Sequence, residues 1–61
     1  MLNLKPNLDQ ADDFYATLIA AHEGLTEAQS EALNARLILI LANHIGNHDV
    51  LDTALQVAAQ P

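Results

Sequence analysis

Two histidines and two aspartates in the C-terminal part of the chain are of types that can bind a metal ion. His44 and His48 lie four positions apart, and Asp49 and Asp52 follow closely. Two histidines at this spacing on one helix can chelate zinc, and carboxylates can complete the ligand set. However, Gly46 and the asparagine after it are typical of a break between two helices, which would separate the histidines. The sequence therefore predicts no metal site and no cofactor, with His48 exposed in the first turn of a helix.

Arg36 is the next residue that could do chemistry, because Lys5 is the only other Lys or Arg in the chain. Two interpretations stay open. In the first, Arg36 forms a structural ion pair with an acid of its own or another chain, as buried charges usually do. In the second, Arg36 binds a small anion in a pocket between helices, together with His44 and Tyr15. The chain has no Ser–His–Asp set, no paired-carboxylate motif and no glycine-rich phosphate loop, so we expect that it is not an enzyme.

Charge and size restrict the partners. The net charge is −6, from eight acids against two basic residues. Nucleic acids and anionic membranes both require clustered basic residues, so neither is an expected partner. With 61 residues and no cysteine, the chain forms one small domain that needs a partner rather than a disulfide for stability. The N-terminus lacks a basic and then apolar leader pattern, which predicts a cytoplasmic location.

The apolar spacing predicts three helices in a single domain over residues 9–59, after an extended arm at residues 1–8. The helices are expected at residues 9–23, 27–45 and 48–59. Helix boundaries are indicated by residues that cap helix starts or adopt the left-handed conformation at helix ends. These are Asp9, Thr26 with Gln29, and Asn47 at the starts, and Gly24 and Gly46 at the ends. The short connections predict an all-α, antiparallel three-helix bundle.

The segment at residues 27–45 is the strongest indication of function. Its first half has a polar face, but after Arg36 apolar residues occupy almost every side. A helix that is apolar all round needs cover on every side, which two short neighbours can hardly supply. A buried strand at residues 37–41 is the competing interpretation. We therefore predict an interface formed by Leu33, Leu37, Ile40, Leu41 and Ile45, with Arg36 and Asn43 setting the register or forming an ion pair.

The segment Ala-Arg-Leu, four apolar residues, then Ala-Asn-His-Ile-Gly at residues 35–46 is also distinctive. Together with the Tyr15-to-Thr26 region, it resembles a family of short bacterial proteins, about 60 residues long, classed as a domain of unknown function. The resemblance covers about residues 8–58 and carries no catalytic assignment. It implies an association with flavin-dependent aromatic hydroxylases and related catabolic enzymes. After Gly46, an acidic residue and proline are commoner in that family than Asn47 and His48, which makes a metal role for His48 less expected.

We therefore expect a non-catalytic helical interaction module, with a protein as its partner. It would be a homodimer, and so a homo-oligomer, or a small accessory subunit of a larger bacterial enzyme. The alternative is a carrier of a small molecule or anion that uses an inter-helix pocket near Arg36.

Overall fold

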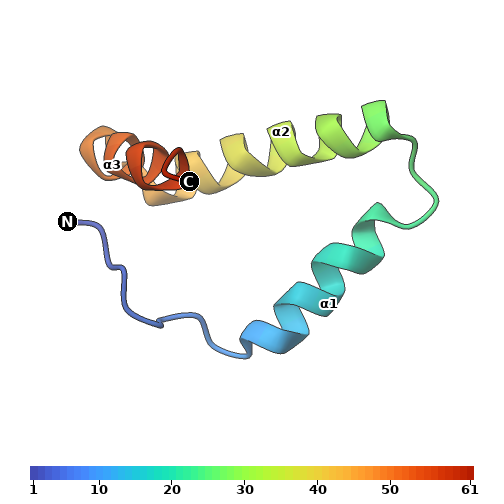
Figure 1. The fold of residues 1–61 in the computed structure, drawn as a ribbon, viewed down its shortest axis with the longest axis horizontal. Helices are drawn as coiled ribbons and strands as arrows, with labels where there is room; N and C mark the ends of the chain where they lie inside the picture. The colour runs from blue at the N-terminus through green and yellow to red at the C-terminus, as the bar shows by residue number, and fades with distance from the viewer.

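The computed structural model describes residues 1–61 and contains three α-helices and no strand. The helices are α1 (Ala11–His22), α2 (Glu27–Ile45) and α3 (His48–Ala58). The predicted all-α, three-helix fold is confirmed, and residues 37–41 are helical rather than a strand. In Figure 1, α1 and α2 diverge from their shared turn like the two arms of an open V, and α3 lies at the far end of α2.

The ends of α2 are determined by its own sequence. Thr26 accepts a hydrogen bond from the Gln29 backbone N–H at 3.2 Å, and the Thr26 backbone N–H donates to Gln29 Oε1 at 3.0 Å. These two bonds form the predicted capping box, which satisfies amides that have no partner inside the helix. At the other end, Gly46 is left-handed (φ 70°) and its N–H donates to the carbonyl of Ala42. Local residues therefore suffice to start and stop this helix.

The capping box yields a testable stability difference. We expect Thr26→Ala to lower the free energy of unfolding by about 1 kcal/mol, because it leaves an amide of the first turn without its acceptor. Thr53→Ala is the matched control, since Thr53 is equally exposed and bonds only to the Asp49 carbonyl one turn earlier. Urea unfolding at one protein concentration measures both. Equal midpoints for the two variants would contradict this role of Thr26.

The start of α1 differs from the expectation. Asp9 is not the N-cap: Gln10 takes that position in a left-handed conformation (φ 53°) with no side-chain cap, and α1 begins at Ala11. The helix keeps Asp12 and Asp13 in its first turn, where negative charge favours the exposed amides. α3 also ends one residue earlier than expected, at Ala58, whereas Asn47 caps its start by accepting from the Val50 N–H.

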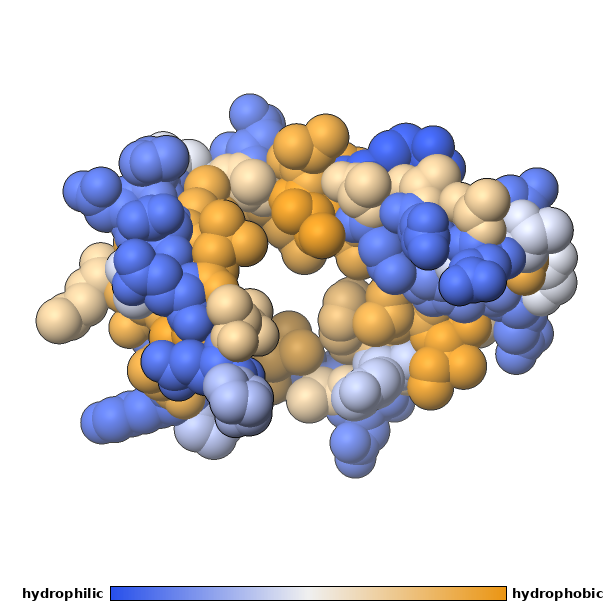
Figure 2. Space-filling model, turned by 45° about the horizontal axis from the view of Figure 1, so that its top comes forward, coloured by the Kyte–Doolittle hydropathy of each residue, from blue (hydrophilic) through white to orange (hydrophobic).

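The helices form an open ring rather than a closed core. No residue is buried, and no two helices pack against each other along their length. The N-terminal arm returns from α1 toward α3, so the two chain ends lie on the same side (Figure 1). Figure 2 shows an opening through the middle of the molecule with apolar residues gathered around it. In this arrangement, one chain therefore leaves its own apolar faces uncovered.

The turn between α1 and α2 holds the two helices at their angle. Gly24 is left-handed (φ 76°), the Glu23 N–H donates to the Ala20 carbonyl, and the Leu25 N–H donates to the His22 carbonyl. A side-chain hydrogen bond also links the helices, between His22 Nδ1 and Ser30 Oγ at 2.9 Å. The open angle is thus specified by several interactions within a few residues of the turn.

Candidate functional site

The more apolar of the two cavities in the molecule is a groove between the C-terminal half of α2 and α3. Its volume is about 460 Å³, and every residue that lines it is apolar. α2 and α3 each contribute four residues: Ile38, Leu41, Ala42, Ile45, Leu51, Ala54, Leu55 and Ala58. Three of them are alanines, whose small side chains leave space for another side chain to approach the backbone. Burying such a surface would contribute roughly 25 cal/mol per Å² removed from water.

The residues predicted for the interface fall into two groups in the structure. Leu41 and Ile45 line the groove, and both are exposed. Leu33 and Leu37 are half-buried outside it, whereas Ile40 is 65% exposed and also lies outside it. The apolar surface of α2 therefore extends beyond the groove, as expected of a helix that is apolar all round.

The residues that could have formed a chemical site are not brought together. Arg36, Asn43, His44 and Tyr15 are all exposed, and none of them lines either cavity of the molecule. His48 is also exposed. No group of three or more potential metal ligands occurs in the structure.

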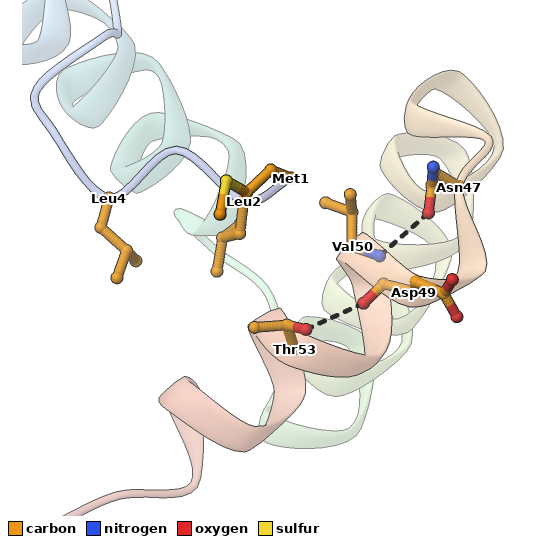
Figure 3. Close-up of a pocket in the computed structure, with 7 residues that line it drawn as sticks. All are labelled: Met1, Leu2, Leu4, Asn47, Asp49, Val50 and Thr53. Carbon is orange, nitrogen blue, oxygen red and sulfur yellow. Dashed lines mark hydrogen bonds between the residues drawn. The ribbon is translucent and has the colours of Figure 1, made fainter.

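A second cavity, of about 440 Å³, lies between the N-terminal arm and the start of α3. Figure 3 shows Met1, Leu2 and Leu4 on one side and Val50 and α3 polar groups on the other. The polar groups here already serve the helix itself. The asparagine at the start of α3 accepts from the Val50 N–H, and the threonine one turn later donates to a carbonyl. This cavity is better described as the place where the N-terminal arm lies beside α3 than as a ligand site.

Two features of the site were not predicted from the sequence. The first is the position of α3 as the second wall of the groove. The His22–Ser30 hydrogen bond was also missed, although His22 ends α1 and Ser30 lies in the first turn of α2. The four-residue connection between these helices could have indicated this hydrogen bond, because so short a connection keeps His22 and Ser30 close.

The chain matches the family described as "Protein of unknown function (DUF2783)" over residues 2–60. It belongs to this DUF2783 family. No curated protein and no solved structure gives a significant match. None of the three helices has the length and apolar character needed to cross a bilayer.

Proposed function

We propose that this DUF2783 member is a non-catalytic interaction module whose hydrophobic core is completed by another protein chain. The partner would be a second copy or a larger enzyme, including a flavin-dependent catabolic enzyme, to which the module binds as a small accessory subunit. The cytoplasm is its proposed location. The acidic charge argues against nucleic acid as the partner, because only two basic residues are present.

The exposed area is the observation that carries this proposal. The single chain exposes 5559 Å². A compact monomer of the same mass, 6.6 kDa, is expected to expose about 3,900 Å². Each chain therefore exposes about 1,700 Å² more than a closed fold would. Two such chains could together remove about 3,400 Å² from water, which lies in the range of obligate interfaces.

The identity of the exposed residues supports the same proposal. Leu39 is 70% exposed and Leu55 is 68% exposed. Large apolar side chains on monomers usually occur singly, whereas contiguous apolar patches mark interaction sites. Here they continue from the end of α2 across the groove onto α3. The alternative of an anion carrier gains no support from the geometry, since Arg36 lines neither cavity.

The concentration dependence of folding tests the proposal. If another chain completes the core, the purified protein should be a stable oligomer, or should be poorly folded until a partner is added. For an oligomer, the urea midpoint should rise with protein concentration, because mass action favours the associated folded state. Light scattering from micromolar to millimolar concentration gives the mass in parallel. A cooperatively folded monomer with a concentration-independent midpoint would overturn the proposal.

A further inference from the structure

We propose that the groove between α2 and α3 binds α1 of a second copy, and that the exchange is reciprocal, so that two open chains close into one core. This inference rests on the proposed function and deepens it by naming the partner and the segment that binds. In a two-fold dimer, each chain would supply one groove and one helix, so each contact occurs twice.

The first argument is that α1 does not cover the groove of its own chain. The turn at residues 23–26 combines a left-handed Gly24, two backbone hydrogen bonds and the capping box at Thr26. The His22–Ser30 hydrogen bond adds a fifth constraint on the angle between the helices. With the turn in this conformation, no residue of α1 lines the groove of its own chain. A helix from another chain can reach the groove while this turn is kept.

The second argument is the size of the chain. Its radius of gyration is 13.3 Å. A compact chain of this length is expected to have a radius of gyration of about 10.5 Å, and a compact assembly of two chains about 13.7 Å. One chain is thus already as extended as a whole closed dimer. This is the dimension expected when two chains intertwine and each one spans the complete assembly, rather than when two globules touch.

The third argument is that α1 has the surface that the groove lacks. Phe14 and Ile19 are exposed, and they lie on either side of the half-buried Leu18, on a face of α1 that is about 140° wide. At 1.5 Å per residue, the stretch from Phe14 to His22 is about 12 Å long, and the Ile38-to-Ile45 wall is about 10 Å long. The groove has no charged lining residue, so the net charge of a second copy does not oppose contact there.

The N-terminal arm is the other segment of a second copy that could enter the groove. Its Leu2 is half-buried, and Leu2 and Leu4 both line the cavity that the arm forms with α3 of its own chain. The arm therefore already lies against α3 of its own chain, whereas no residue of α1 lines either cavity. For this reason we assign the groove to α1.

Disulfide trapping between two differently tagged chains tests this arrangement. The chain has no cysteine, so each introduced thiol is unique. Chains with Ile19→Cys and chains with Leu55→Cys are unfolded together, refolded and oxidised in a glutathione buffer. A disulfide forms only when the two Cα atoms approach to about 4.4–6.8 Å. The matched control replaces Leu55→Cys by Gln56→Cys, the exposed neighbour outside the groove. Circular dichroism verifies that every variant keeps its helices.

We expect the 19–55 mixed disulfide to form at least about tenfold faster than the 19–56 disulfide, because the two α3 positions face different sides of the helix. Two other results would overturn the α1 assignment and leave the proposed interaction module intact. One is a dimer that forms a disulfide between two copies of position 55 but none between positions 19 and 55. The other is a dimer in which a Leu4→Cys chain forms the disulfide with position 55 and the Ile19→Cys chain does not. A cooperatively folded monomer without any interchain disulfide overturns both, whereas a poorly folded monomer overturns only the exchange between two copies. If a cysteine variant loses helicity, NMR contacts between methyl groups are measured instead, on wild-type protein in which two differently isotope-labelled chains are mixed. Contacts between Ile19 of one chain and Leu55 of the other support the α1 assignment. A dimer without these contacts overturns it.

Discussion

Replacing Leu41 by aspartate is expected to abolish association and, with it, most of the helical structure at micromolar concentration. Leu41 lines the groove and is 47% exposed in the single chain, and the proposed function places it under the partner. The substitution removes an apolar anchor and places an unpaired carboxylate where water is excluded. Together these effects should cost at least about 3 kcal/mol, which is more than roughly a hundredfold in the dissociation constant. Light scattering and circular dichroism measure the two losses.

Two further variants separate an interface effect from a general effect of charge. Ala35→Asp puts the same carboxylate on the same helix at an exposed position that lines neither cavity. It should leave the oligomer nearly unchanged. Leu41→Met keeps the volume and apolar character and should cost less than about 1.5 kcal/mol. If Leu41→Asp stays folded and associated, the groove is not the interface.

Replacing Gly24 by proline is expected to keep the helices but to weaken association at least about tenfold, because the angle between α1 and α2 changes. Gly24 has φ 76°, whereas proline holds φ near about −65°. The turn must therefore rearrange, and α1 must leave in a new direction. An added side chain meets no atom within 4 Å, so the effect comes from backbone conformation and not from a clash. Sedimentation over a concentration series measures the dissociation constant.

Gly24→Asn is the matched control for this prediction. Asparagine adopts the left-handed conformation more readily than other residues with a side chain. It should keep the turn and bring the dissociation constant close to that of the natural chain. If Gly24→Pro associates as tightly as Gly24→Asn, the direction of α1 plays no part in the interface, and the interface must lie on α2 and α3 alone.

The helices themselves could be predicted from neighbouring residues. Thr26 with Gln29, Asn47, and the two left-handed glycines each act through hydrogen bonds or dihedral angles within four residues, so the signals are complete in the local sequence. The failure at Asp9 is of the same local kind. Gln10 adopts a left-handed conformation there, and the sequence has no glycine near this position that would have indicated such a conformation.

The sequence by itself determined the three helices, their short connections and the surplus of apolar residues on α2, because these depend on spacing and on contacts a few residues apart. Only the tertiary structure decided that α3 forms the second wall of a groove with Leu41 and Ile45, and that Arg36 lies outside it. It also decided that the chain stays open. The relative direction of two helices depends on a few dihedral angles in the turn, and a small change there moves the far end of a helix by many ångströms. That information is not contained in the periodicity of either helix.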